Sequence, residues 1–273
     1  MQPIGVFDSG IGGLSVLKAI HAETPQIPTI YLADQIHVPY GVRSLEEVRQ
    51  FSAEITSLLL SQGAGMIVVA CNTASAAALH FLRMKFPEIP FVGMEPAVKP
   101  AAEATHSHVV GVLATEATFQ GALYASVVER FAKDVRIMQD TLPGLVSQIE
   151  AGKLDDQSTR EILNSAIQPM LASGIDTIVL GCTHFPFVIP LINEITGNRV
   201  RVIDPAPAIA RQVKRLYGNL PSTDGYPSAG NRYLTSGNPL RFKQMVNMLT
   251  GVDVSPEVVD WQGSGKLNLH PQE

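Results

Sequence analysis

Two cysteines are the residues of this sequence best suited to chemistry. Cys71 is followed by Asn-Thr and Cys182 by Thr-His, and each comes directly after an apolar run. A thiol has an ordinary pKa of about 8.5, so neighbouring groups can tune it to hold or release a proton near neutral pH. With only two cysteines in a reducing compartment, a structural disulfide is not expected and both should be free thiols. Such a pair could act as acid and base.

An internal repeat favours a functional role for both cysteines. The alternative for a cysteine beside a buried strand is an inert small hydrophobic residue. However, residues 63–73 match residues 174–184 at one constant separation, which also relates Cys71 to Cys182. Each cysteine thus ends an equivalent strand, before a loop or helix start whose N–H groups stabilise a thiolate.

A weaker repeat relates the first strands of the two halves. Residues 5–9 match residues 111–115, and Asp34 matches Asp140. The separation is slightly shorter here than for the cysteines, which predicts a loop insertion. Repeats of this kind indicate architecture that local propensity does not reveal.

The chain alternates between strand-like and helix-like segments. Short β-branched runs bounded by turn residues occupy residues 4–7, 29–32, 66–69, 91–93, 109–113, 135–138, 177–180 and 200–203. Helix-length stretches between them include residues 45–61, 74–85, 121–132 and 158–172. This alternation predicts the α/β class with parallel sheets.

The repeat predicts two similar parallel-sheet α/β domains related by pseudo-twofold symmetry. The first would comprise residues 1–97 plus 208–273, with helix-like stretches at 208–217 and 240–249, and the second residues 98–207. Ligands of parallel sheets bind beyond the carboxyl ends of the strands, where both cysteines stand, so we expect the active site in the cleft between the domains. The polar tail from Trp261 to Glu273 is expected to be a frayed end.

Composition excludes several classes of partner. The 273 residues carry a formal charge of −5 without a run of Lys or Arg, which argues against nucleic acid and against an anionic membrane surface. No apolar stretch reaches the roughly 20 residues that span a bilayer. The start lacks the basic and apolar regions of a signal peptide, so we expect a cytoplasmic protein that binds a small molecule.

Other polar residues have a structural interpretation when each is taken alone. The Asp8–Gly13 segment follows the first strand, yet it is neither a dinucleotide fingerprint nor a Walker A loop, and Asp8 could simply cap a helix. Tyr40, in Pro39-Tyr40-Gly41, is typical of a surface turn. His184 could be a buried histidine whose hydrogen bonds are all made within the core, and Glu150 could be a solvent-exposed residue at the end of a helix.

Taken together, four segments resemble glutamate racemase, in the aspartate/glutamate racemase superfamily. They are Asp8-Ser9-Gly10-Ile11-Gly12-Gly13, Pro39-Tyr40-Gly41, Ala70-Cys71-Asn72-Thr73-Ala74-Ser75 and Gly181-Cys182-Thr183-His184-Phe185-Pro186. They stand in the family order and span most of the chain. Residues 150–152 and 114–118 are also similar to family segments.

The resemblance implies an enzyme that interconverts L- and D-glutamate without pyridoxal phosphate, another cofactor or a metal. The D-glutamate would supply peptidoglycan synthesis. Members of the family are usually homodimers. It implies that Cys71 removes the α-proton of D-glutamate and Cys182 that of L-glutamate. Asp8 would assist Cys71, and His184, supported by Glu150, would assist Cys182. The implied substrate-binding residues are Asp8, Ser9, Pro39, Tyr40, Gly41, Cys71, Asn72, Thr73, Thr115, Thr118, Cys182, Thr183 and His184.

Three departures and several alternatives accompany this resemblance. Leu142 stands where many relatives carry cysteine, Pro205 stands where serine is frequent, and Gln35-Ile36-His37 before Val38-Pro39 is unusual. An aspartate or broad-specificity racemase shares the paired cysteines but usually has Glu in place of His184, and a decarboxylase needs only one thiol. A thiol–disulfide enzyme would want a CxxC motif, which is absent. A binding protein that kept the scaffold is a further alternative, since some relatives are reported to bind DNA gyrase.

Overall fold

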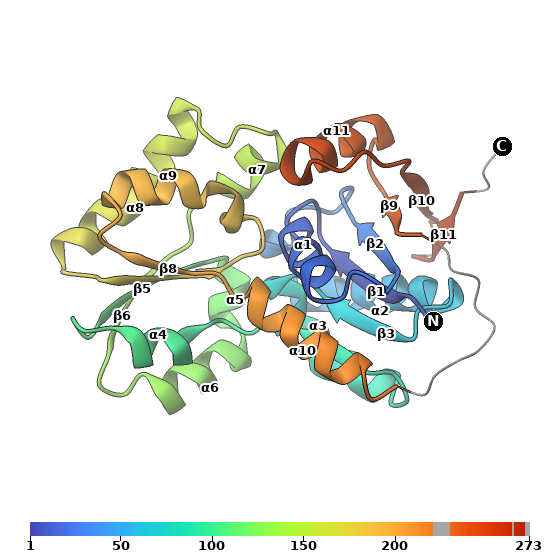
Figure 1. The fold of residues 1–273 in the computed structure, drawn as a ribbon, viewed down its shortest axis with the longest axis horizontal. Coiled ribbons are helices and arrows are strands. Elements are labelled where there is room, and N and C mark those ends of the chain that lie inside the picture. The colour runs from blue at the N-terminus through green and yellow to red at the C-terminus, as the bar shows by residue number, and fades with distance from the viewer. Residues whose placement is uncertain (221–229, 264, 271–273) are drawn as a thin grey trace. The chain divides into compact units, whose positions relative to one another are not determined.

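The computed structural model describes residues 1–220, 230–263 and 265–270 of the chain. The chain divides into two compact units, Met1–Met94 with Ala206–Glu273, and Glu95–Pro205. Each unit contains a parallel sheet covered by helices, which confirms the predicted α/β fold class (Figure 1). Residues 221–229, 264 and 271–273, which belong to the predicted returning segment and tail, lie outside the described residues.

The described part of the first unit forms a seven-stranded sheet in the order β11-β10-β9-β2-β1-β3-β4. Only the β10–β11 pair is antiparallel. The strands are β1 (Ile4–Asp8), β2 (Thr29–Ala33), β3 (Met66–Val69), β4 (Phe91–Gly93), β9 (Arg232–Thr235), β10 (Glu257–Trp261) and β11 (Leu267–Leu269). Every residue of β1, β2 and β3 is buried, as expected of parallel strands covered on both faces.

Helices of the first unit pack in two groups. Helix α1 (Leu14–Glu23) contacts α10 (Ala206–Tyr217) and α11 (Pro239–Thr250), while α2 (Leu45–Ser61) contacts α3 (Asn72–Lys85). Helix α2 begins with a capping box, in which the Ser44 hydroxyl accepts from the Glu47 N–H and the Glu47 carboxylate accepts from the Ser44 N–H. A short 3-10 helix, η1 (Tyr40–Val42), precedes it.

The prediction of a frayed C-terminal tail is wrong for its described residues. Trp261 ends β10, and Leu267–Leu269 form β11, which pairs with β10. Leu267 and Val259 are buried in the core of the first unit. An ion pair between Arg232 and Glu257, with two N···O distances of 2.7 Å, joins β9 to β10.

The second unit contains a four-stranded parallel sheet in the order β6-β5-β7-β8. The strands are β5 (Val109–Ala114), β6 (Arg136–Asp140), β7 (Thr177–Gly181) and β8 (Arg201–Ile203). The helices are α4 (Val98–Ala104), α5 (Glu116–Gln120), α6 (Ala122–Phe131), α7 (Leu145–Glu150), α8 (Gln157–Ala172) and α9 (Ile189–Thr196), with the 3-10 helix η2 (Phe185–Val188) before α9. In Figure 1, α8 and α9 lie on one side of this sheet and α4 and α6 on the other.

The same strand order occurs in both units. The order β2-β1-β3-β4 in the first sheet corresponds to β6-β5-β7-β8 in the second. The register agrees as well: Gly5 of β1 lies opposite Ile67 of β3, and Gly111 of β5 lies opposite Ile178 of β7. The sequence repeat is therefore a structural repeat, and it places the segments that follow β1 and β3 in positions equivalent to those that follow β5 and β7.

No helix formed by the described residues is long and apolar enough to cross a membrane.

Candidate active site

Cys71 caps helix α3 with its sulfur. The residue has extended backbone angles, and its Sγ accepts a hydrogen bond of 3.4 Å from the N–H of Ala74. Its thiol lies 4.0 Å from the hydroxyl oxygen of Ser9 and is oriented to donate to it. Only 5 % of Cys71 is exposed. A sulfur at a helix N-terminus faces backbone N–H groups and the positive end of the helix dipole, an environment that attracts negative charge.

Asp8 is the last residue of β1 and Ser9 follows it, at the same edge of the sheet as Cys71. The N–H of Ala70 donates to the carbonyl of Phe7, which keeps the two chain segments in register just beyond the strand ends. Asp8 is fully buried, and its Oδ2 accepts a hydrogen bond of 2.7 Å from the N–H of Gly13. Asp8 therefore stabilises its own glycine-rich loop, as the structural interpretation expects.

Asn72 and Thr73 form the first turn of α3, and each is only 3 % exposed. Within the described part of the chain, neither the Nδ2 nor the Oδ1 atom of Asn72 has a hydrogen-bond partner. Buried polar atoms are almost always paired, because an unpaired one retains its desolvation cost. This amide, next to Cys71, can therefore serve a ligand.

Tyr40 is buried, contrary to the expectation for a tyrosine in a surface turn. Only 1 % of it is exposed, and its hydroxyl donates a 2.7 Å hydrogen bond to Oδ2 of Asp34. Burial, followed by the charge and hydrogen bond of Asp34, raises the pKa of Tyr40 well above its ordinary value. The phenol therefore keeps its proton and directs it to Asp34. The flanking Pro39 and Gly41 are half-buried.

In the second unit, His184 bridges a thiol and a carboxylate. Its Nδ1 lies 3.7 Å from Sγ of Cys182, and its Nε2 lies 2.7 Å from Oε1 of Glu150, the last residue of α7. His184 and Cys182 are 2 % and 7 % exposed. Burial lowers the pKa of His184, but the hydrogen bonds and negative charges of Cys182 and Glu150 outweigh burial and hold that pKa well above its usual range.

Two threonines stand at the carboxyl end of β5, beside β7. Thr115 caps α5 by accepting from the N–H of Thr118, and the two hydroxyl oxygens are 3.0 Å apart. Ala114 of β5 pairs with Gly181 of β7. Thr115 and Cys182 each follow one of these two residues, so they leave neighbouring strands at the same edge of the sheet. Thr183, directly after Cys182, is also buried.

Within each unit, the predicted residues therefore gather at one edge. Those in the first unit are Asp8, Ser9, Pro39, Tyr40, Gly41, Cys71, Asn72 and Thr73, and those in the second are Thr115, Thr118, Glu150, Cys182, Thr183 and His184. Both cysteines are free thiols. Among the described residues, no three His, Cys, Asp or Glu side chains are grouped so that they could hold a metal ion.

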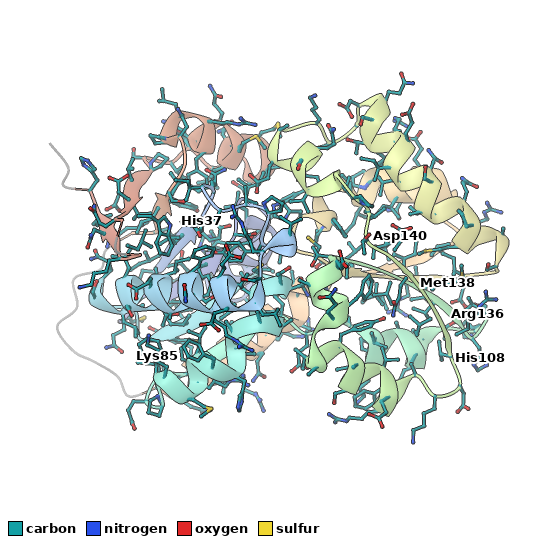
Figure 2. The ribbon with its side chains drawn as sticks, turned by 180° about the vertical axis from the view of Figure 1, so that it is seen from behind. His37, Lys85, His108, Arg136, Met138 and Asp140 are labelled. Carbon is teal, nitrogen blue, oxygen red and sulfur yellow. The ribbon has the colours of Figure 1, made fainter. Side chains whose placement is uncertain are left out.

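Asp34 has no role predicted from the sequence, yet it accepts the hydrogen bond of the Tyr40 hydroxyl. Asp34 follows β2 and is fully buried. Its position in the weaker repeat, opposite Asp140, was the one signal that could have identified it. Figure 2 shows Asp140 at the end of β6, beyond Arg136 and Met138.

A cavity of about 340 Å³ lies between the β6–α7 loop and α8. Its walls include Leu142, one of the departures from the family pattern. Leu142 is buried and has a backbone φ of 47°, and its N–H donates to Oδ1 of Asp140.

Comparisons with known proteins agree with this geometry. A family model described as Asp/Glu/Hydantoin racemase matches residues 4–213. A glutamate racemase of Ectopseudomonas mendocina is 49 % identical over 249 residues, covering 91 % of this chain and 95 % of the relative. The resemblance to glutamate racemases is thus confirmed.

Two solved structures share the fold over nearly the whole chain. Escherichia coli glutamate racemase, in complex with L-glutamate and the activator UDP-MurNAc-ala, has a TM-score of 0.84 at 30 % identity and covers 99 % of this chain and 100 % of its own. Francisella tularensis glutamate racemase, in complex with D-glutamate, has a TM-score of 0.80 at 29 % identity. The match covers 95 % of this chain and 97 % of the Francisella chain. The chain is an isomerase of the amino-acid racemase type and belongs to the Asp/Glu/hydantoin racemase family.

Proposed function

We propose that this protein interconverts L- and D-glutamate by a two-thiol acid/base mechanism without a cofactor. One observation carries the proposal: each unit ends an equivalent strand with a buried, free cysteine, Cys71 after β3 and Cys182 after β7. The glutamate racemases to which the chain is similar, two of them solved with glutamate bound, support the choice of substrate.

Two opposed thiols meet the stereochemical requirement of racemisation. A thiolate removes the α-proton and becomes a thiol, while the C–H electron pair remains on a planar carbanion. The other thiol then donates its proton to the opposite face and becomes a thiolate. A single base would return the proton to the face it left. In this scheme Cys71 deprotonates D-glutamate and Cys182 deprotonates L-glutamate.

Different neighbours prepare the two thiols. The N–H groups of α3 favour a thiolate at Cys71, and Asp8, buried at the same edge, would assist its proton transfer. His184, held in orientation by Glu150, would lie beside the sulfur of Cys182 and assist its proton transfer. The repeat places Thr73 at the position equivalent to His184, so the asymmetry is part of the sequence.

Neutral hydrogen-bonding groups would bind the two carboxylates and the ammonium of glutamate. Asn72 is the best supported of these, because both of its buried amide atoms lack a partner among the described residues. The others proposed are Ser9, Pro39, Tyr40, Gly41, Thr73, Thr115, Thr118 and Thr183. A site that provides dedicated polar partners discriminates against a substrate that leaves them unpaired.

The proposal extends to the biological setting. D-glutamate produced in this way would supply peptidoglycan synthesis. The mechanism needs both thiols reduced, which fits the cytoplasm. We also propose that the protein functions as a homodimer, as the resemblance implies.

Circular dichroism of L- and D-glutamate, with L- and D-aspartate as competing substrates, tests the function. Both glutamate enantiomers should racemise, and aspartate should react slowly or not at all. Cys71→Ser and Cys182→Ser should each reduce racemisation by a factor on the order of 1,000 or more, because a positioned acid or base contributes about 100- to 10,000-fold.

Two results would contradict the proposal. Near wild-type racemisation by either serine variant would exclude the two-thiol mechanism, and preferential turnover of aspartate would exclude the substrate. Thermal unfolding of both variants should stay close to that of the wild type, which separates lost chemistry from lost structure.

A further inference from the structure

Asp34 connects two distant parts of the first unit. Its Oδ2 accepts hydrogen bonds from the Tyr40 hydroxyl at 2.7 Å and from Nδ1 of His37 at 2.8 Å. Its Oδ1 accepts from the Ser236 hydroxyl at 2.9 Å and from Nε1 of Trp261 at 2.8 Å. One oxygen thus faces the loop that carries Tyr40, and the other faces the C-terminal strands.

Asp34 is fully buried, and these four donors occupy the hydrogen-bond acceptor sites of its two carboxylate oxygens. A carboxylate has about four lone-pair sites, so four donors in four directions leave it little freedom to rotate. Hydrogen bonds to an ionised group are also roughly twice as strong as neutral ones. The orientation of Asp34 therefore fixes the direction in which the Tyr40 hydroxyl points.

Further hydrogen bonds hold the same two segments together. The Ser236 N–H donates to the carbonyl of Ala33, and the Ile36 N–H donates to the Ser236 hydroxyl at 3.1 Å. The Thr235 hydroxyl donates to Oε1 of Gln35 at 2.9 Å. The start of the loop after β2 is thus attached to the residues that follow β9.

An aromatic cluster fixes the indole of Trp261. His37, labelled in Figure 2, stacks on Phe51 with ring centroids 3.9 Å apart and an interplanar angle of 9°. Trp261 packs edge-on against both rings, at 5.0 Å from His37 and 5.4 Å from Phe51. The ring centroids of Tyr40 and Phe51 are 5.7 Å apart. The indole N–H is therefore directed at Asp34 by packing.

We propose that Trp261 is a positioning residue for the substrate loop, residues 34–43. Its indole N–H orients the Asp34 carboxylate, which in turn holds the Tyr40 hydroxyl. This inference rests on the proposed role of Tyr40 and its neighbours in binding glutamate. Because the phenolic proton is given to Asp34, Tyr40 would serve the substrate through its oxygen lone pair, its ring or the adjacent backbone, and not as a donor.

Trp261 is also an intrinsic fluorescent probe, because it is the only tryptophan in the sequence. Intrinsic tryptophan fluorescence therefore measures this one site. We expect D-glutamate to change the emission of the wild type in a saturable way, with a midpoint near the KM. A Trp261→Phe variant should lose the signal, which identifies its source.

The Trp261→Phe variant tests the inference because it keeps an aromatic ring against His37 and Phe51 but removes the N–H donor. We expect the KM for both glutamate enantiomers to rise roughly tenfold, the effect of losing a hydrogen bond to a charged group, with a smaller change in kcat. Amide hydrogen exchange should accelerate in residues 34–43. Ser236→Ala, which removes the other donor to Oδ1, should act in the same direction.

Tyr217→Phe is the matched control. It removes an aromatic hydroxyl that donates a 2.6 Å hydrogen bond to the carbonyl of Gln2 in the same unit. It should lower the thermal midpoint as much as Trp261→Phe without changing the KM or the exchange of residues 34–43. An equal rise in KM in Tyr217→Phe would show a general effect of stability and would overturn the inference.

The outcomes separate this inference from the proposed function. If the wild type racemises glutamate but Trp261→Phe changes neither the KM nor the loop exchange, or if D-glutamate leaves wild-type fluorescence unchanged, Trp261 is not a positioning residue. If the wild type does not act on glutamate, the proposed function fails, and the inference fails with it as a statement about substrate binding. In that case loop exchange still decides whether Trp261 holds residues 34–43.

Discussion

The imidazole of His184 lies between Glu150 and Cys182, with its Nε2 2.7 Å from the carboxylate and its Nδ1 3.7 Å from the sulfur. All three side chains belong to one unit, and His184 is almost fully buried. The hydrogen bonds and charges of Cys182 and Glu150 raise the pKa of His184, which favours the protonated ring. The sulfur of Cys182 thus has an imidazole neighbour, whereas the sulfur of Cys71 faces the N–H groups of α3.

Glu150→Gln should shift the pH dependence of the reaction that starts from L-glutamate. The Glu150 carboxylate raises the pKa of His184, so removing its charge lowers that pKa and the ring loses its proton at a lower pH. The alkaline limb of kcat should therefore move to lower pH. Profiles of kcat against pH in both directions measure the shift.

The control for this variant is Glu194→Gln, which neutralises an exposed partner of Arg160 in the same unit. It should leave the profile unchanged. An alkaline limb that stays in place in Glu150→Gln would show that Glu150 does not set the protonation of His184.

Asn72→Ala should weaken substrate binding without destabilising the fold. Both buried amide atoms lack a partner among the described residues, so their removal relieves a desolvation cost of about 1–3 kcal/mol per group. We expect an unchanged or higher thermal midpoint together with a KM raised roughly tenfold. Asn164→Ala, which removes a donor to the Arg160 carbonyl, should leave the KM unchanged. If Asn72→Ala lowered the thermal midpoint and left the KM unchanged, the amide would stabilise the fold and would not bind substrate.

Gly181→Ala should destabilise the second unit, because β7 and β5 approach too closely for a side chain. A Cβ at residue 181 would lie 2.7 Å from Cβ of Ala114 and 3.2 Å from the carbonyl oxygen of Leu113. Overpacking of this kind costs about 1–3 kcal/mol, measurable by urea denaturation. Because Cys182 is the next residue, kcat should fall too. Gly230→Ala, where a Cβ meets no atom of the described residues within 4 Å, should change neither quantity.

Asp176→Asn should reduce the acid sensitivity of stability. Burial raises the pKa of Asp176, but hydrogen bonds from the Thr105 hydroxyl and from the N–H groups of Ser107 and His106 outweigh it and lower the pKa to about 2. A carboxyl with a lowered pKa stabilises the fold above its unfolded pKa, and this contribution disappears as the pH falls toward 2. The wild type should therefore be more stable than the variant at pH 5 and should lose that advantage between about pH 4 and pH 2. A constant difference across this range would contradict the assignment.

Local pattern determined the elements that carry the two cysteines. The predicted helix over residues 45–61 is α2 with the same bounds, because a capping box defines its start and apolar spacing defines its buried face. The predicted strands over 66–69 and 91–93 are β3 and β4. The repeat added information that propensity lacks, since it placed Cys71 and Cys182 after equivalent strands.

Only tertiary pairing produced the strands β9, β10 and β11. β9 forms on β2, about 200 residues earlier in the chain, and β10 and β11 extend the sheet from there. These strands are three to five residues long, so local pattern did not predict them, and β11 lies in the segment predicted to be a frayed tail. A strand of this kind exists because a neighbouring strand accepts its hydrogen bonds.

The chemical environment of the site was also decided by the tertiary structure. The family resemblance implied site roles for His184 and Tyr40, but the pKa of each depends on burial and on Cys182 and Glu150 or Asp34, respectively. Two of the four donors to Asp34, His37 and Tyr40, lie within six residues of it, whereas Ser236 and Trp261 lie more than 200 residues away in the sequence. A pKa and a hydrogen-bond direction depend on distances in space, which residue order determines only through the complete fold.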